Sequence, residues 1–380
     1  MSTIISPPTP LRDFQNSSKI FSHLDRVLEL KESGDTRPVH ITLGLTNFCN
    51  HKCPWCYINW TQAGASAKRS GNYTPEATKP KILATERLIQ ALAEAKDLGL
   101  KAVTIVGDGE PTLHPKFIAY LQAIKNLGLD IGIFSNLSFA DKKIVEALCE
   151  NCFFVRGSID ACTKETHKIT HGSDDFDKVI NNLKTVITYR NQSRLKRPVV
   201  GVQYVVNQFN YREVADAARF YKDLGVDYMS IKPAYKNKLN PDHPENEIDL
   251  KETFALMQRA EQEQMETFKV YAKYPQFLAV VGQGTNDAKY YKKCYATPLS
   301  PYLDEDGNLE MCGNLKGRGF TMGNVIERSF GEIWKSAQRR SCLDRIDLFQ
   351  CPAGCKLDPL NKVLWDAFHP DTERVHPNFT

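Results

Sequence analysis

The chain has 380 residues, of which 42% are hydrophobic and 25% are charged, and its formal net charge is +4. This is ordinary globular composition, with enough length for one large domain and a smaller one. So small a net charge predicts no binding to nucleic acid or to a membrane by field strength alone. The N-terminus lacks the apolar segment of a signal peptide, and no apolar run approaches the roughly 20 residues that span a bilayer, so we expect a cytoplasmic protein.

The chain begins with a short extension and continues with alternating strands and helices. Residues 1–38 start with several prolines and then carry one amphipathic helix over about 18–32. We expect six strands, at 40–46, 101–109, 130–136, 153–160, 199–207 and 227–233. Helices are expected at about 85–98, 116–127, 141–149 and 211–224, with one more before residue 199. Apolar strands that alternate with helices predict an α/β fold with a parallel sheet, here a partial barrel of six strand–helix units over 39–240.

Three cysteines follow the first predicted strand within a few residues. Cys49, Cys53 and Cys56 stand in the stretch CNHKCPWCY, and the next cysteine is Cys149. Cysteines clustered in this way in a cytoplasmic enzyme indicate a metal site or catalysis, since disulfides are rare in that compartment. A zinc site would need a fourth ligand, and the spacing of His51 is unlike that of a zinc finger. An iron–sulfur cluster held by three thiolates would instead leave one iron open to a ligand.

Polar and glycine-rich residues also follow the later strands. Residues 107–111 read GDGEP after the second strand, Asn136 ends the third, and Ser158 and Asp160 end the fourth. In a barrel of parallel strands the carboxyl ends meet at one face, which is where active sites are built. The polar stretch 58–82 lies beside the cysteines and is either a surface insertion or a lid.

The cysteine spacing Cys-x3-Cys-x2-Cys, with Tyr57 directly after it, resembles that of the radical S-adenosylmethionine (SAM) superfamily. The resemblance implies a [4Fe-4S] cluster on Cys49, Cys53 and Cys56 and SAM bound at the open iron, where reductive cleavage yields a 5′-deoxyadenosyl radical that abstracts hydrogen from the substrate. It also implies a set of SAM contacts: Tyr57, Gly107, Asp108, Gly109, Glu110, Pro111, Asn136, Ser158 and Asp160. The departure is Asp108, which stands where the family usually has glycine.

The pattern changes after residue 240. Residues 241–290 read as a helical linker with a helix at 248–268, and residues 291–380 carry five further cysteines. Their order resembles the C-terminal SPASM and twitch modules of the same superfamily, which hold auxiliary clusters. The resemblance implies one auxiliary [4Fe-4S] cluster on Cys294, Cys312, Cys351 and Cys355, with a hairpin turn at 304–307. Zinc is the alternative metal for four cysteines.

The remaining cysteines have several possible roles. Cys342 is expected to pack in the core, to replace a cluster ligand or to donate a hydrogen atom, and Cys162 is a second candidate hydrogen donor. Cys149 and Cys152 are interpreted as core residues.

The resemblance implies the cofactors and the initiation of the reaction, but not the substrate. The leading hypothesis is oxidation of a small polar metabolite, such as a cyclitol or amino sugar, with help from the auxiliary cluster. Epimerisation with a cysteine hydrogen donor and modification of a ribosomal peptide or protein side chain are the alternatives. A small-molecule substrate is preferred to a peptide, because residues 1–38 are too short for a peptide-binding domain. A reducing partner such as flavodoxin or ferredoxin is expected.

Overall fold

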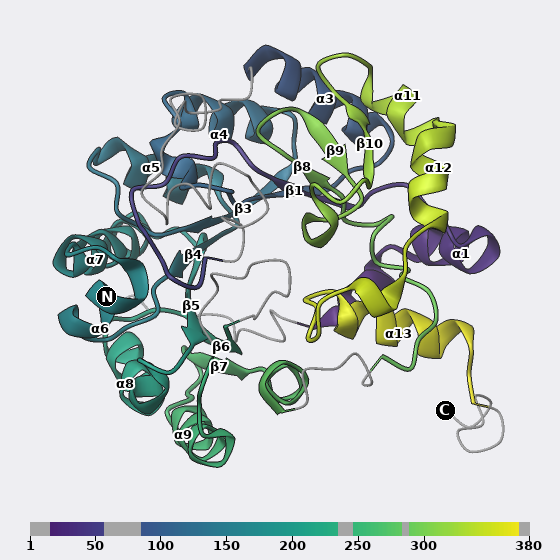
Figure 1. Cartoon of the computed structure of the whole chain (residues 1–380). Coiled ribbons are helices and arrows are strands. Elements are labelled where there is room, and N and C mark those ends of the chain that lie inside the picture. Colours follow the sequence, from purple (N-terminus) through teal and green to yellow (C-terminus); the bar gives the residue numbers. More distant parts are fainter. Residues whose placement is uncertain (1–15, 57–84, 235–245, 283–288, 372–380) are drawn as a thin grey trace, which may run out of the picture.

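The computed structural model describes residues 16–56, 85–234, 246–282 and 289–371, and Figure 1 shows its strands around a ring with helices on the outside. The six predicted strands are β1 (His40–Leu43), β2 (Ala102–Ile105), β3 (Asp130–Ser135), β4 (Phe154–Ser158), β5 (Val199–Val206) and β6 (Tyr228–Pro233). Neighbours in the chain pair in parallel throughout this series. The prediction of an α/β fold with a partial barrel is confirmed.

The outer layer consists of the helices that connect these strands. They are α3 (Thr85–Asp97), α4 (Phe117–Asn126), α5 (Lys143–Asn151), α6 (Lys164–His171), α7 (Phe176–Gln192), η3 (Tyr211–Glu213) and α8 (Val214–Asp223). The single helix expected before residue 199 is two helices, because Gly172 adopts a left-handed φ of 58° and ends α6.

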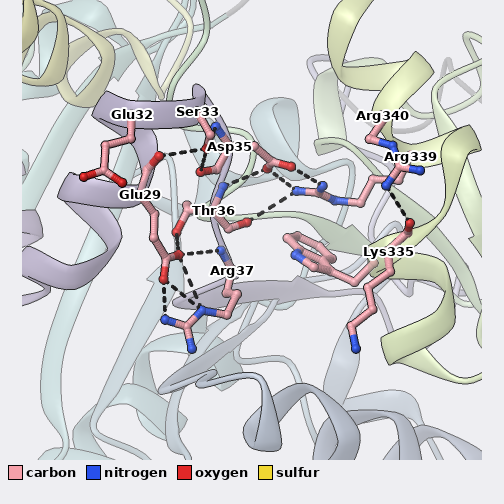
Figure 2. A pocket seen from close by; sticks show the side chains of 10 residues that line it. Glu29, Glu32, Ser33, Asp35, Thr36, Arg37, Lys335, Arg339 and Arg340 are labelled. Carbon is pink, nitrogen blue, oxygen red and sulfur yellow. Dashed lines mark hydrogen bonds and ion pairs between the residues drawn. The ribbon is translucent and has the colours of Figure 1, made fainter.

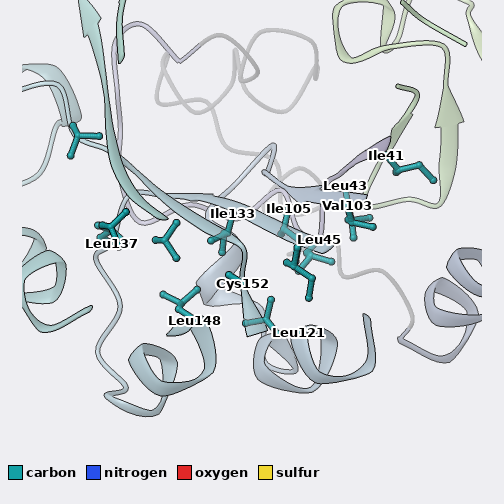
Figure 3. Close-up of a cluster of buried hydrophobic side chains, with 14 of the residues drawn as sticks. Ile41, Leu43, Leu45, Val103, Ile105, Leu121, Ile133, Leu137, Leu148 and Cys152 are labelled. Atoms are coloured by element: carbon teal, nitrogen blue, oxygen red, sulfur yellow. The ribbon is translucent and has the colours of Figure 1, made fainter. Parts of the chain in front are cut away.

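Alternate residues of each strand point toward the helices and form the core (Figure 3). Ile41, Leu43, Val103, Ile105 and Ile133 are fully buried, and they belong to one core cluster with apolar residues of the surrounding helices. Since side chains alternate along a strand, the residues between them face the inside of the ring, and we call this the inner face. The residues of the inner face are largely polar or aromatic. The apolar core thus lies between the strands and the helices, and the interior of the ring is suited to a polar ligand.

The sheet continues beyond the six predicted strands at both edges. β7 (Lys269–Ala272) pairs in parallel with β6, and β8 (Tyr302–Leu303) pairs in parallel with β1. β8 turns back into β9 (Asn308–Glu310), and β10 (Thr321–Asn324) completes a sheet of ten described strands. The hairpin expected at residues 304–307 is confirmed, and Gly307 supplies its left-handed φ of 83°. The late cysteines therefore belong to a segment that is joined to the barrel through β1.

Shorter elements complete the fold. After β6 come α9 (Leu250–Gln262), where a longer helix was expected, α10 (Tyr274–Phe277), η4 (Leu278–Gly282), η5 (Gly313–Leu315), α11 (Phe330–Lys335), α12 (Ala337–Asp344), η6 (Leu348–Gln350) and α13 (Asp358–Phe368). A short η2 (Pro111–Leu113) follows β2. The helix expected at 18–32 is split at His23 into η1 (Ser17–Ser22) and α1 (Leu24–Ser33). Ile20 and Leu30 from these two helices pack with Leu364 of α13, so the two ends of the described chain share a small core.

An ion pair fastens the N-terminal extension to the C-terminal helices (Figure 2). Arg339 of α12 donates to both carboxylate oxygens of Asp35 at 2.6 and 2.5 Å, and its guanidinium stacks on Trp334 at 3.9 Å. Arg339 is only 2% exposed, whereas the Asp35 side chain is 31% exposed. The arginine is thus the buried partner and depends on this carboxylate for its counter-charge.

Asp35→Ala is expected to lower the free energy of unfolding by about 3 kcal/mol, because it leaves the buried Arg339 guanidinium without its carboxylate partner. The control is Asp25→Ala, whose side chain is 62% exposed in its pairs with Arg26 and Arg37 and is worth about 0.5 kcal/mol or less. Thermal unfolding followed by circular dichroism compares the two variants. Equal midpoints for both would contradict the assigned role of Arg339.

Candidate active site

The three-cysteine loop lies directly after β1, at the carboxyl ends of the strands. The Cys56 N–H donates to the carbonyl of Cys53 at 3.1 Å and closes a turn, and the His51 N–H donates to Cys49 Sγ at 3.4 Å. Burial raises the pKa of the Cys53 thiol, and the neighbouring Cys56 and Cys49 raise it further. The Cys53 thiol therefore lies close enough to Cys49 and Cys56 for their charges to interact.

Residues 107–111 pack against this cysteine loop through the backbone. The Gly109 N–H donates to Thr46 at 2.9 Å, and the Glu110 N–H donates to Phe48 at 2.8 Å. A Cβ added at Gly109 would lie 2.0 Å from the Phe48 carbonyl oxygen, and one at Gly107 would lie 2.1 Å from the Gly109 carbonyl oxygen. Gly109 is required by the close approach of the two chain segments, and Gly107 is required by the tight course of the loop itself.

Glu110 is buried, and its carboxylate is used inside the fold. One oxygen accepts from the Thr112 N–H at 3.0 Å, the Thr112 hydroxyl at 2.6 Å and the Ser135 hydroxyl at 2.7 Å. The other accepts from the Asn136 N–H at 2.7 Å. Glu110 thus links the end of β2 to the end of β3, while Pro111 begins η2. Glu110 therefore holds the loop and Asn136 in register, and its contact with SAM stays a prediction.

Asp108 points toward the C-terminal segment. Its carboxylate accepts from the Tyr302 hydroxyl at 2.8 Å and from the Lys316 ammonium. The same ammonium contacts Glu305 at 3.0 Å and Asp304 at 3.5 Å, and all four charged residues are buried. Burial and the nearby Glu305 raise the pKa of Asp108, although Lys316 lowers it. The aspartate that replaces the usual glycine therefore joins the loop at 107–111 to the β8–β9 hairpin.

The remaining predicted SAM contacts lie at the ends of β3 and β4. The Asn136 amide donates to the side-chain oxygen of Asn50 at 2.8 Å and approaches Cys49 Sγ at 4.0 Å. Asp160 accepts from the Val205 N–H at 2.7 Å, and burial raises its pKa to about 7. Ser158 is the last residue of β4 and is half-buried. Tyr57 and residues 58–82 lie outside the described residues.

A cluster of three histidines contacts the cysteine loop. No prediction from the sequence included this cluster. His51 contacts His171 at 3.3 Å and Asp175 at 3.1 Å, and His171 lies 3.4 Å from Cys53 Sγ. His167 contacts the other oxygen of Asp175 at 3.0 Å. His167 and His171 are four residues apart on α6 and share one face, and this spacing was the signal available in the sequence. The cluster ties the loop to α6 and α7.

Four late cysteines from three segments lie close enough for their charges to interact. Burial raises the pKa of Cys312 to about 12, and the nearby Cys294 and Cys351 raise it further. Burial also raises the pKa of Cys355, and the nearby Cys312 and Cys294 add to that shift. Amide groups surround the sulfurs: Asn361 donates to Cys294 at 3.4 Å, Asn314 to Cys355 at 3.3 Å, and the Leu357 N–H to Cys355 at 3.5 Å. Donors directed at sulfur stabilise thiolates, so this set fits a metal or an iron–sulfur cluster.

The other cysteines contact carbonyl or carboxylate oxygens or pack in the core. Cys342 on α12 is 1% exposed and contacts the Thr321 carbonyl at 3.7 Å, within the apolar core. Cys162 donates to Glu213 at 3.5 Å, and burial, followed by Glu213, raises its pKa to about 12. Cys149 and Cys152 are buried core residues.

Comparison with known proteins identifies the barrel. Residues 43–221, from β1 into α8, match the family model for the radical SAM superfamily. Among curated proteins, the tungsten-containing aldehyde ferredoxin oxidoreductase cofactor-modifying protein of Pyrococcus furiosus is 22% identical over 320 residues, which is 78% of this chain and 81% of that protein. A probable GTP 3′,8-cyclase of Saccharolobus islandicus is 26% identical over 197 residues, which is 51% of this chain and 57% of the cyclase.

Solved structures share the fold. SuiB of Streptococcus suis bound to S-adenosylmethionine has a TM-score of 0.63 at 16% identity, over 88% of this chain and 76% of SuiB. The structure of anSMEcpe with bound AdoMet has a TM-score of 0.57 at 15% identity, over 87% of this chain and 96% of that one. None of the described helices is long and apolar enough to cross a membrane. The chain thus contains a radical SAM domain over residues 43–221, the domain of a superfamily whose cofactors are a [4Fe-4S] cluster and SAM.

Proposed function

We propose that Cys49, Cys53 and Cys56 hold the [4Fe-4S] cluster and that SAM binds beside it, against residues 107–111 and Asn136. When bound, the two cofactors supply reductive cleavage of SAM and removal of a hydrogen atom from the substrate. The observation that carries this proposal is the backbone contact between the cysteine loop and residues 107–111. It supports the proposal because the segment that leads into Cys49 lies directly against residues 107–111, the stretch in which the resemblance implies SAM contacts.

A second cluster at Cys294, Cys312, Cys351 and Cys355 is the next part of the proposal. Four cysteines satisfy a [4Fe-4S] cluster completely, and the three N–H donors directed at their sulfurs would tune its reduction potential. Zinc accepts the same four ligands, and an iron count separates the two metals. Cys342 is not needed for this set, because the other four cysteines complete it, and the Cys342 thiol contacts the Thr321 carbonyl instead.

The proposed reaction is oxidation of a small polar molecule. A second cluster would accept an electron from the substrate radical, as oxidation requires. Epimerisation would instead need a thiol near the substrate to return a hydrogen atom. Cys342 is buried in the core and Cys162 is bonded to Glu213, so neither favours a hydrogen donor. Small polar substrates are also consistent with the relatives, a cofactor-modifying protein and a probable GTP 3′,8-cyclase, although the chain spans 57% of the cyclase's length.

Modification of a peptide is the second candidate. SuiB bound to its precursor peptide SuiA has a TM-score of 0.63 over 90% of this chain. At 17% identity this is a likeness of fold, and it supports a peptide substrate here only as an alternative.

Anaerobic reconstitution is expected to load about eight iron atoms per chain, which is two [4Fe-4S] clusters. Cys312→Ala should bind about four, because one ligand of the second site is lost. Cys342→Ala is the matched control and should keep about eight. Iron and sulfide assays make the comparison. A wild-type content of about four iron atoms with zinc present would contradict the second cluster.

Cys53→Ala is expected to abolish 5′-deoxyadenosine formation from SAM with dithionite, by at least about a hundredfold, because the cluster loses one of three ligands. Cys149→Ala, in the core behind β3 and β4, should retain most of the activity. Chromatography of the products measures both. Cleavage of SAM by Cys53→Ala at the wild-type rate would contradict the assignment of the site.

Lys316→Met is expected to weaken SAM binding, because it leaves Asp108 buried with Asp304 and Glu305 and without their common counter-charge. Repulsion between the three carboxylates would displace Asp108 and with it the loop at 107–111. The affinity for SAM should therefore drop by about tenfold or more. Equilibrium dialysis with SAM measures the affinity, and Lys335→Met, at an exposed position of α11, is the control. Thermal unfolding of both variants separates a local effect from loss of the fold. Unchanged affinity in folded Lys316→Met would argue against this coupling.

A further inference from the structure

The cysteine loop lies against the C-terminal end of α6, and this contact brings one histidine ring to a sulfur. The Lys52 N–H donates to the His171 carbonyl at 2.9 Å, and a Cβ at Gly172 would lie 2.7 Å from the Lys52 carbonyl oxygen. Lys52 directly precedes Cys53, so the backbone contact also places the His171 ring beside Cys53, with Nδ1 3.4 Å from Sγ. The ring is fixed there because His171 is only 2% exposed.

The other ring nitrogen of His171 decides where the proton of the ring lies. The Asp160 N–H donates to Nε2 at 3.1 Å, so Nε2 presents its lone pair. The Asp160 carboxylate lies 3.6 Å from the same nitrogen, which is beyond hydrogen-bonding distance, so the backbone N–H is the partner of Nε2. A neutral imidazole with a bare Nε2 carries its proton on Nδ1, the nitrogen that faces Cys53.

His51 and Asp175 are arranged in agreement with this tautomer. Burial alone would raise the pKa of Asp175, but hydrogen bonds, first from Ser138 and Ser173, lower it, so the carboxylate is ionised. An ionised carboxylate only accepts, so His51 Nε2, at 3.1 Å from it, carries a proton. His51 Nδ1 faces His171 Nδ1 at 3.3 Å and presents a lone pair, because two N–H groups cannot point at each other.

The proton on His171 Nδ1 thus has two acceptors, and the sulfur is the better one. The 3.3 Å separation from His51 Nδ1 exceeds the range of about 2.7–3.2 Å for an ordinary N–H hydrogen bond. Sulfur is a larger atom, so 3.4 Å to Cys53 Sγ is a full contact. A thiolate is moreover a charged acceptor, and charge-assisted hydrogen bonds are roughly twice as strong as neutral ones.

We propose that His171 is a positioning residue that donates its Nδ1–H to the Cys53 thiolate and thereby raises the reduction potential of the cluster. This inference rests on the proposed function, in which Cys53 is a cluster ligand. Reduction makes the cluster and its thiolates more negative, and a hydrogen bond to a thiolate stabilises the more negative state. His171 would therefore favour the electron transfer from a reductant that the proposed chemistry requires.

Two substitutions at residue 171 separate the donor from the rest of the ring. His171→Asn places an amide nitrogen near the position of Nδ1, whereas His171→Gln places its amide near Nε2, so only the asparagine keeps a donor toward Cys53. His167→Gln is the matched control, because His167 stacks on the same ring at 4.6 Å but bonds Asp175 instead of a sulfur.

The first measurement is a redox titration of the reconstituted enzymes, followed by electron paramagnetic resonance of the reduced-cluster signal that changes when SAM is added. At a fixed potential, His171→Gln is expected to lower the ratio of reduced to oxidised cluster by about threefold to tenfold, where tenfold is about 59 mV for one electron. His171→Asn and His167→Gln should stay within about twofold of the wild type. Thermal unfolding shows that each variant is folded.

The second measurement uses the wild-type sequence, so it does not depend on the folding of a variant. The enzyme is labelled with ring-¹⁵N histidine, reconstituted, loaded with SAM and reduced with dithionite. Pulsed electron paramagnetic resonance is then expected to show coupling of the cluster spin to a histidine ring nitrogen and to a proton that exchanges in D₂O. The nitrogen coupling should persist in His167→Gln and be lost in His171→Gln.

The outcomes separate this inference from the proposed function. A wild-type enzyme without the ring-nitrogen coupling, or a folded His171→Gln with an unchanged potential, would overturn the role of His171. The SAM-sensitive signal and the iron content, measured on the same preparations, would then leave the cluster on Cys49, Cys53 and Cys56 standing. Loss of the SAM-sensitive signal from the wild type itself would overturn the proposed function and this inference together.

Discussion

The contact between the cysteine loop and residues 107–111 is the constraint on which the site depends. Two backbone hydrogen bonds, from Gly109 to Thr46 and from Glu110 to Phe48, bring the segments after β1 and β2 together. The Glu110 carboxylate extends the same connection to the end of β3 through Asn136. A side chain at Gly109 would collide with the Phe48 backbone, so the approach exists only because that residue is glycine. Three strands of the barrel therefore act as one support for the thiolates.

A second set of contacts connects this support to the C-terminal segment. β8 pairs with β1, so the late hairpin is an extension of the barrel sheet. Lys316, four residues after Cys312, reaches Asp108 in the loop at 107–111. The two cysteine groups are consequently linked by a strand pair and by a buried ion pair. A change of charge in this ion pair would be felt at both ends, because buried charges are weakly screened.

Much of the fold could be predicted from the sequence, because apolar runs and glycine turns are local signals. The six strands and the hairpin at 304–307 follow from such patterns. The split of the helix before residue 199 at Gly172 was missed, since glycine within a polar helix carries only a weak signal. β7 was missed because four residues after α9 give too short a pattern to distinguish from the end of a helix.

The sequence by itself determined the chemistry of the site: the spacing of Cys49, Cys53 and Cys56 and the glycines of residues 107–109 are fixed by covalent order. Only the tertiary structure decided which partners the charged residues take. Asp108 turns to Lys316 across 208 positions of the chain, and His51 turns to Asp175 across 124, and neither separation leaves a periodic trace in the sequence. The physical reason is that burial makes an unpaired charge costly, and the fold alone decides which opposite charge is within reach.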